Sequence, residues 1–248
     1  MRRLAFGLLA GLAATLAPAE PPARTPAATV VYKVPDVARL RLFLRDPAGH
    51  AYGSLAAVDA AVTASGRRLA FAMNAGMYER DRSPTGLYVA DGREVRALNV
   101  LRRMPDGSTP NFYLPPNGVF AVTKAGPMIV ATPDWACSPP AGVTLATQSG
   151  PLLLVHGAIV APAVAIGTDA LANQWRRNGV CVNGRDVLLV EADAMTLHQF
   201  AVHLRDALHC QDALYLDGVI SAVWDSRSGR HDPVDPGNPL GPILGLVE

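Results

Sequence analysis

The sequence lacks an excess of charge of either sign: 22 lysines and arginines are balanced by 21 aspartates and glutamates, and the formal net charge is +1. A near-neutral chain offers no broad basic surface, so we expect no nucleic-acid partner and no binding to a membrane surface. Half of the residues are hydrophobic. A chain of 248 residues with this composition predicts one domain with a sizeable core.

Cysteine is scarce, with only Cys137, Cys181 and Cys210. Their spacing matches no zinc-binding template, so we expect neither a metal site nor another cofactor. In an oxidising compartment these residues allow one disulfide and one free thiol, and the sequence does not select the pair. The chain also lacks the H-E-x-x-H pattern of zinc proteases and the G-x-S-x-G pattern of serine hydrolases.

Long hydrophobic runs are absent beyond the N-terminus. Residues 1–19 combine a basic start, an apolar run and a final A-x-A motif, which predicts a cleavable signal peptide. Residues 20–29, rich in proline and alanine, predict a flexible leader. We therefore expect an exported protein, periplasmic or secreted, without a membrane span in its mature form. Its folded domain is expected to cover residues 30–248.

Short apolar runs separated by glycine-containing turns are frequent along the chain. Four of them predict β-hairpins, with turns at Asp91-Gly92, Lys124-Ala125-Gly126, His156-Gly157 and Asn183-Gly184. Four successive hairpins indicate a large sheet system with antiparallel or mixed pairing.

Two helices are predicted from their capping residues. Residues 55–65 follow Ser54, a favourable N-cap. Residues 197–208 follow Thr196, which is placed to form a capping box with Gln199. The predicted fold class is α+β (mixed α/β), with a central mixed sheet built largely of hairpins and a few helices packed on it.

Each predicted helix leads into an apolar strand that ends on short polar residues. Residues 68–73 run into Asn74 and Gly76, and residues 213–216 run into Asp217 and Gly218. Taken alone, each pair is ordinary turn chemistry. Their shared position predicts that they meet at one rim of the sheet, where a strand end holds a polar group rigidly and a glycine leaves room for a ligand.

Two further polar clusters lie between these strand ends. Ser149 and Gly150 close a predicted strand, and Arg176, Arg177 and Asn178 open the fourth hairpin. Taken alone, the two arginines are typical of a solvated loop, and Ser149 is either a turn residue or a hydroxyl that faces a ligand.

Six motifs occur in a fixed order along residues 30–248: NAGMY (74–78), SPTGLYV (83–89), NFYLPPNGVFAV (111–122), TQSGPLLL (147–154), RRNGVCV (176–182) and ALYLDGVIS (213–221). Together they resemble the bacterial members of the phosphodiester glycosidase domain family. The resemblance implies a hydrolase that breaks the bond between a sugar's anomeric carbon and a phosphodiester. It also implies a link to exopolysaccharide, because bacterial members are usually described in that context.

The implied reaction assigns roles to the polar clusters. The anomeric carbon becomes positive and needs a carboxylate, for which we select Asp217 as nucleophile or base. The departing phosphate needs cations and hydrogen-bond donors, since guanidinium groups match phosphate oxygens. The expected catalytic residues are Asp217, Asn74, Ser149 and Arg177, and the expected substrate-binding residues are Gly76, Gly150, Arg176, Asn178, Gly218 and Ser221.

Two other functions remain open from the sequence. The chain could be a non-catalytic module that binds or assembles polysaccharide, because only one well-placed carboxylate is evident. It could also be a metal-dependent phosphodiesterase in which Asp217 and a second acid hold a divalent cation. Glu191 and Asp193 are the candidates for a second acid. The sequence identifies neither the sugar nor the stereochemical outcome.

Overall fold

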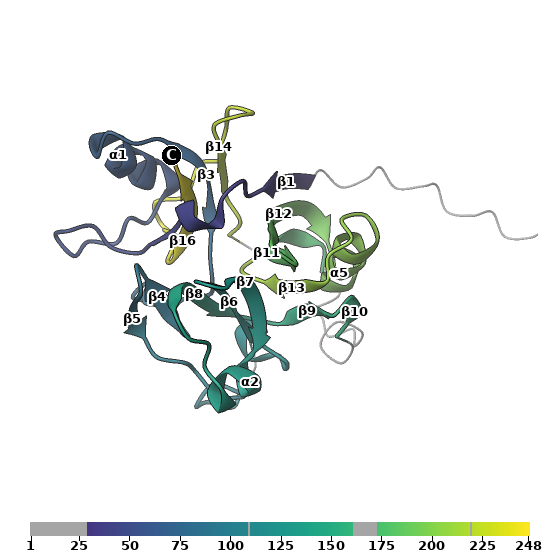
Figure 1. Cartoon of the computed structure of the whole chain (residues 1–248). Coiled ribbons are helices and arrows are strands. Elements are labelled where there is room, and N and C mark those ends of the chain that lie inside the picture. Colours follow the sequence, from purple (N-terminus) through teal and green to yellow (C-terminus); the bar gives the residue numbers. More distant parts are fainter. Residues whose placement is uncertain (1–28, 109, 161–172, 219) are drawn as a thin grey trace, which may run out of the picture.

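The computed structural model describes four stretches of the chain, residues 29–108, 110–160, 173–218 and 220–248 (Figure 1). The predicted signal peptide, residues 1–19, lies outside the described residues, as does the predicted leader except for Thr29. That residue begins the first strand of the fold. Within the described stretches, no helix is long and apolar enough to cross a membrane.

The strands form three antiparallel sheets. The first sheet has six strands in the order β1 (Thr29–Lys33), β12 (Asp186–Met195), β11 (Trp175–Asn183), β13 (Asp212–Tyr215), β9 (Leu152–Val155) and β10 (Ala158–Ile159). The second has five, in the order β15 (Arg230–His231), β14 (Val223–Asp225), β3 (Leu69–Asn74), β16 (Ile243–Val247) and β2 (Leu40–Phe43). The third also has five, in the order β5 (Arg93–Arg96), β4 (Tyr88–Ala90), β8 (Val143–Ser149), β6 (Gly118–Thr123) and β7 (Gly126–Ala131).

This arrangement confirms the prediction of a strand-rich fold with a few helices. The expectation of a single, mixed central sheet is wrong, because the strands form three antiparallel sheets. The two apolar strands predicted to share a sheet belong to different ones. Strand β3 pairs with β14 and β16, whereas β13 pairs with β11 and β9. Every described strand pairing is antiparallel. Apolar composition predicts that a strand is buried on both faces, but it carries no information about the pairing partner.

All four predicted hairpins are confirmed, as β4–β5, β6–β7, β9–β10 and β11–β12. Two turns differ by a residue. Thr123 pairs with Gly126, so that only Lys124 and Ala125 form the turn between β6 and β7. Asn183 pairs with Asp186, so that Gly184 and Arg185 form the turn. Gly184 has a φ of +62°, and a glycine at the first position of a two-residue turn adopts this conformation without strain.

The helices begin where their caps predict. Helix α1 (Leu55–Ala64) starts after Ser54, whose side chain accepts a hydrogen bond from the Ala57 N–H. Helix α5 (Leu197–Asp206) starts with both bonds of the capping box formed. Three short helices were not predicted: η1 (Val37–Arg39), η2 (Asn111–Tyr113) and α2 (Thr132–Cys137).

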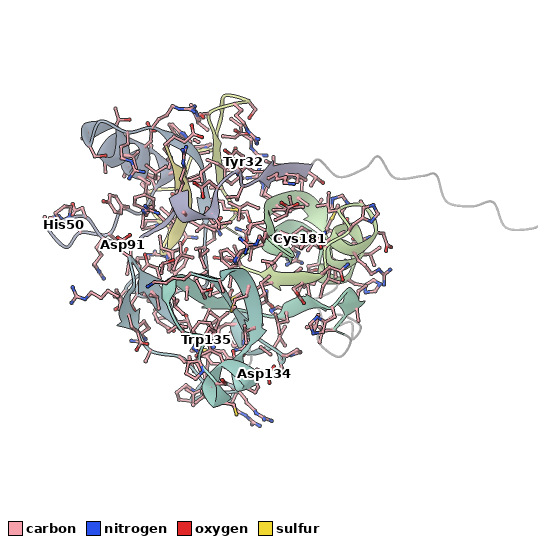
Figure 2. The ribbon with its side chains drawn as sticks, viewed as in Figure 1. Tyr32, His50, Asp91, Asp134, Trp135 and Cys181 are labelled. Atoms are coloured by element: carbon pink, nitrogen blue, oxygen red, sulfur yellow. A yellow bond between two sulfur atoms is a disulfide. The ribbon has the colours of Figure 1, made fainter. Side chains whose placement is uncertain are left out.

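The core lies between the three sheets, and each longer helix covers one of them (Figure 1). Helix α5 buries Leu197, Phe200 and Leu204 against the first sheet, whereas α1 packs on the second. A disulfide joins Cys181 to Cys210, which answers the pairing that the sequence left open. Cys181 lies within the first sheet in Figure 2, and the exposed Cys137 is the free thiol.

Candidate active site

Asn178 joins the ends of the two buried strands. Its side-chain Nδ2 donates to the backbone oxygen of Asn74 at 3.0 Å, and its Oδ1 accepts from the backbone N–H of Asp217 at 2.7 Å. Asn178 is fully buried in β11. The end of β3 in the second sheet and the end of β13 in the first sheet therefore lie together, as the sequence predicted, although they belong to different sheets.

Two serines hold the segment around Asp217 from other directions. The Ser149 hydroxyl, at the end of β8 in the third sheet, donates to the backbone oxygen of Leu216 at 2.5 Å. The Ser221 hydroxyl donates to the backbone oxygen of Asp217 at 3.1 Å. The first sheet, the third sheet and the loop before β14 thus each contribute a residue that holds the backbone around Asp217.

Asn74 has one unused hydrogen-bond donor. Its Oδ1 accepts from the Ala222 N–H at 3.1 Å, but its Nδ2 is buried and has no hydrogen-bond partner in the described structure. An unsatisfied buried donor is costly and rare in folded proteins. Asn74 therefore keeps one donor that the described residues do not use.

Asp217 carries a carboxyl group with an altered acidity. Burial raises its pKa to about 6, although a hydrogen bond from the Gly218 N–H, 2.7 Å from Oδ1, acts in the opposite direction. Part of the residue still reaches solvent. The hydroxyl of Tyr78 has a raised pKa, first from burial and then from the negative charge of Asp217. The negative charge of Asp217 therefore acts on the Tyr78 hydroxyl.

Arg177 is a buried cation that has no carboxylate partner among the described residues. It is 1% exposed, and its guanidinium donates to Met195 O at 2.8 Å, Asn173 O at 2.6 Å and the Tyr215 hydroxyl at 3.2 Å. None of the described ion pairs involves this residue. Two of its five N–H donors remain unassigned. A buried positive charge without a counter-ion is unfavourable unless an anion binds nearby.

Tyr215 connects Arg177 to Asp217 electrostatically. Burial raises the pKa of its hydroxyl to about 12, while the positive charge of Arg177 lowers this pKa and the negative charge of Asp217 raises it. The hydroxyl therefore stays protonated at neutral pH. Sequence reasoning missed Tyr215 because it lies in the apolar run 213–216, where a tyrosine is typical of a hydrophobic core.

Gly76 and Gly218, which were expected to leave room for a ligand, instead allow close packing of the protein itself, and Gly150 is packed in the same way. A Cβ on Gly218 would lie 1.7 Å from the Tyr215 hydroxyl, and one on Gly76 would lie 2.4 Å from Gln148 O. A Cβ on Gly150 would lie 2.7 Å from Phe112 O. Real contacts of this kind do not occur, so each position excludes larger residues for packing reasons.

The structure corrects the expectation that Arg176 and Arg177 form one phosphate clamp. Successive strand residues point to opposite faces of a sheet, so the two guanidiniums separate. Arg176 is paired with the carboxylate of Asp193 at 2.8 Å and donates to Ser221 O at 3.2 Å. Its Nε also lies 3.7 Å from Glu191 Oε1. Arg176 is therefore neutralised by acids.

The two candidates for a second acid both belong to this ion-pair network. Glu191 is buried, and its Oε2 accepts from Arg230 at 3.0 Å. Arg230 also donates to both carboxylate oxygens of Asp232, at 2.8 and 2.7 Å. Burial raises the pKa of Glu191, and the Arg230 hydrogen bond opposes that shift. The network fastens the first sheet to the second beside Asn178.

An open pocket of about 840 Å³ is lined by Tyr78, whereas Asp217, Asn178 and Arg177 are not among its lining residues. Tyr78 lines it together with Met77, and Phe112 and Tyr113 from η2 form another part of the wall. Sugar-sized ligands commonly bind in pockets of a few hundred Å³ that combine aromatic walls with a few polar groups. The pocket is thus lined by residues of three of the sequence motifs, NAGMY, SPTGLYV and NFYLPPNGVFAV.

The strand-rich α+β fold of this chain is similar to that of solved structures. The catalytic domain of zebrafish N-acetylglucosamine-1-phosphodiester alpha-N-acetylglucosaminidase, auto-inhibited by its pro-peptide, superposes with a TM-score of 0.61 at 15% identity. The match covers 91% of this chain and 84% of that domain. A hypothetical protein from Synechocystis superposes with a TM-score of 0.51 at 17% identity, covering 89% of this chain and 59% of that one.

The chain belongs to the phosphodiester glycosidase family, whose model matches residues 67–247. It is 31% identical over 192 residues to the uncharacterised protein YigE of Escherichia coli K12, a match that spans 77% of this chain and 71% of that protein. The resemblance seen in the six motifs is thereby confirmed.

Proposed function

We propose that this protein is an exported hydrolase that cleaves glycosyl-1-phosphodiesters of the cell envelope or of exopolysaccharide, at the bond between the anomeric carbon and the phosphate oxygen. Family membership supports the reaction class. The observation that carries the proposal is the buried Arg177, which has no carboxylate partner among the described residues and is linked through Tyr215 to the carboxylate of Asp217. This arrangement offers an anion site beside a base.

The chemistry of the leaving group matches these residues. Breaking the carbon–oxygen bond leaves the electron pair on a phosphate monoester, whose second pKa is about 6. Such a group departs without strong protonation, so donors that stabilise its charge are sufficient. Arg177, the protonated Tyr215 hydroxyl and the unpaired Asn74 amide are the proposed donors.

Asp217 is the proposed nucleophile or base. As a base it accepts a proton from water while the water oxygen bonds to the anomeric carbon; as a nucleophile it forms a glycosyl ester that water then hydrolyses. Both routes require the ionised form. Glu191 and Asp193 are engaged by Arg230 and Arg176, which leaves Asp217 as the acid that serves the reaction.

The test uses the purified mature protein and a p-nitrophenyl sugar-1-phosphodiester, with and without chelator. We expect release of free sugar in both conditions, with kcat/KM rising about tenfold per pH unit below about pH 6 and level above it. Asp217→Asn should abolish turnover, whereas Asp186→Asn, which changes an exposed carboxylate, should not. Full activity in Asp217→Asn would contradict the assignment.

Isotope incorporation decides which bond breaks. In water labelled with oxygen-18, cleavage at carbon places the label in the sugar hydroxyl. Label in the phosphate, together with loss of activity in chelator, would instead indicate a metal-dependent phosphodiesterase. Binding of polysaccharide without turnover of any phosphodiester would indicate a non-catalytic module.

A further inference from the structure

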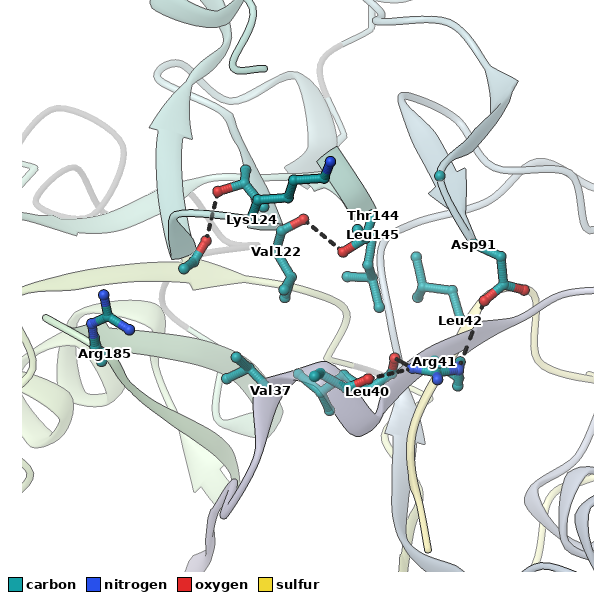
Figure 3. Close-up of a pocket in the computed structure, with 14 residues that line it drawn as sticks. Val37, Leu40, Arg41, Leu42, Asp91, Val122, Lys124, Thr144, Leu145 and Arg185 are labelled. Atoms are coloured by element: carbon teal, nitrogen blue, oxygen red, sulfur yellow. Dashed lines mark hydrogen bonds and ion pairs between the residues drawn. The ribbon is translucent and has the colours of Figure 1, made fainter. Parts of the chain in front are cut away.

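A second pocket, of about 620 Å³, lies where the three sheets meet (Figure 3). The second sheet contributes β2, the third sheet contributes β6, β8 and two hairpin turns, and the first sheet contributes the turn between β11 and β12. None of the residues assigned to the candidate active site lines this pocket.

Strand register places the pocket at the opposite end of the strands from Asp217. In the third sheet, Gly118 pairs with Ser149 at the active-site end, whereas Thr123 at the other end of β6 lines the pocket. In the first sheet, Asn178 lies at the active-site end of β11, and Arg185 follows its far end. Five strand residues span about 16 Å. A ligand in this pocket therefore does not contact the active-site groups.

The floor of the pocket is apolar. Leu40, Leu42, Val122 and Leu145 line it and are otherwise buried in the core between the sheets. Figure 3 shows these side chains between Arg185 on one side and Arg41 with Asp91 on the other. The floor thus suits an aliphatic group, since contact removes apolar surface from water.

Three cations line the pocket, and two of them have no charged partner in the part of the chain that the structure describes. Arg41 donates to two backbone oxygens at 2.7 Å and lies 3.7 Å from Asp91, whose carboxylate is the acid in the lining. Lys124 and Arg185 take part in none of the side-chain hydrogen bonds or ion pairs of the described structure. The stem of Lys124 packs over Gly142, where an added Cβ would lie 3.3 Å from its Cγ. The lining therefore carries a net positive charge beside an apolar floor.

We propose that this pocket binds an aliphatic phosphate ester, with the phosphate at Lys124 and Arg185 and the chain on the apolar floor. A dianionic phosphate matches two free cations, and the guanidinium offers it two parallel donors. The volume falls within the range of pockets that bind small ligands. This site is independent of the proposed hydrolysis.

The test measures binding of monomeric octyl phosphate to the full mature protein by titration calorimetry. We expect Lys124→Ala/Arg185→Ala to weaken binding at least tenfold. Arg93→Ala/Arg102→Ala, which removes two exposed arginines outside the pocket, should leave binding unchanged. Inorganic phosphate and octyl glucoside should each bind at least tenfold more weakly than octyl phosphate. Thermal melts check that both double variants fold, and hydrolysis of a soluble substrate should be equal in them.

Equal binding of octyl phosphate to both double variants would overturn the proposal. So would inorganic phosphate binding as tightly as octyl phosphate, because the apolar floor would then contribute nothing. Sedimentation with phosphatidic acid vesicles distinguishes the source of the ester. If the protein sediments with the vesicles and the Lys124→Ala/Arg185→Ala variant does not, the ester is a lipid headgroup. If the protein does not sediment with the vesicles but still binds octyl phosphate, the ester is a soluble molecule.

Discussion

Asp217 combines a charge that the proposed reaction requires with a position that disfavours that charge. Burial raises its pKa from 3.8 to about 6, so the folded protein binds this proton more tightly than the unfolded chain does. The contribution of this group to stability is therefore largest below about pH 4 and falls as the pH rises towards 6. At neutral pH the ionised carboxylate destabilises the fold.

We accordingly expect Asp217→Asn to be more stable than the natural protein at pH 7.5, by about 1–3 kcal/mol, because it removes a buried charge. The asparagine oxygen can still accept the Gly218 hydrogen bond. The advantage should disappear at pH 3.5, where the carboxyl is protonated in both states. Denaturant unfolding at the two pH values measures this, with Asp186→Asn as the exposed control. A destabilised Asp217→Asn at pH 7.5 would show that the carboxylate is not penalised by burial.

Hairpins and helix ends form from chemistry within a few residues. Asp91-Gly92 and His156-Gly157 both have positive φ at both turn positions, as residues of a tight hairpin turn require. The chain after helix α5 is held by a residue distant in sequence, because the disulfide between Cys181 and Cys210 links it to β11. That link crosses from one element to another.

Two measurements test the disulfide: the number of reactive thiols and the free energy of unfolding. Unfolded, non-reduced protein should show one reactive thiol, and reduced protein three, with the Cys181–Cys210 peptide found by mass spectrometry. Cys181→Ala/Cys210→Ala should lower the free energy of unfolding by about 2–4 kcal/mol, since the link closes a loop of 29 residues. Cys137→Ala, at the exposed thiol, is the control and should change little. Three reactive thiols in non-reduced protein would refute the pairing.

The whole molecule depends on the junction where the three sheets meet at the active-site end. Asn178 bonds to the second sheet through Asn74 and to the end of β13 through Asp217, and Ser149 adds the third sheet. The ion pairs from Arg176 and Arg230 to the acids around Glu191 reinforce the same junction. Stability and the geometry of the proposed site therefore share these bonds.

Asn178→Ala should lower the free energy of unfolding by about 2–4 kcal/mol, because it leaves a buried backbone oxygen and a buried N–H without partners. It should also reduce turnover, since the backbone of Asp217 loses its support. Asn183→Ala on the same strand removes one exposed hydrogen bond to His209 O and should cost less than about 0.5 kcal/mol. Equal losses in the two variants would argue against a special role for the junction.

Much of the architecture was predictable from neighbouring residues in the chain. The four hairpins, both capped helices, the two buried strands and the polar residues at their ends all followed from turn residues, caps and apolar periodicity. These features depend on interactions between residues close in sequence, which every chain with that local pattern makes in the same way. The prediction that Asn74, Asn178 and Asp217 lie together came from the sequence motifs that contain these residues.

Other features required the folded chain. Asn178 and Asn74 are 104 residues apart, and Ala222 and Asn74 are 148 apart, so their bonds depend on which strands pair. The pairing of distant strands gave three sheets in place of the one expected, and it directed Arg176 away from Arg177. It also brought Cys210 to Cys181 and placed the Tyr215 hydroxyl against Gly218. Local pattern states that a strand is buried, but the free energy of packing distant strands together determines what each buried side chain meets.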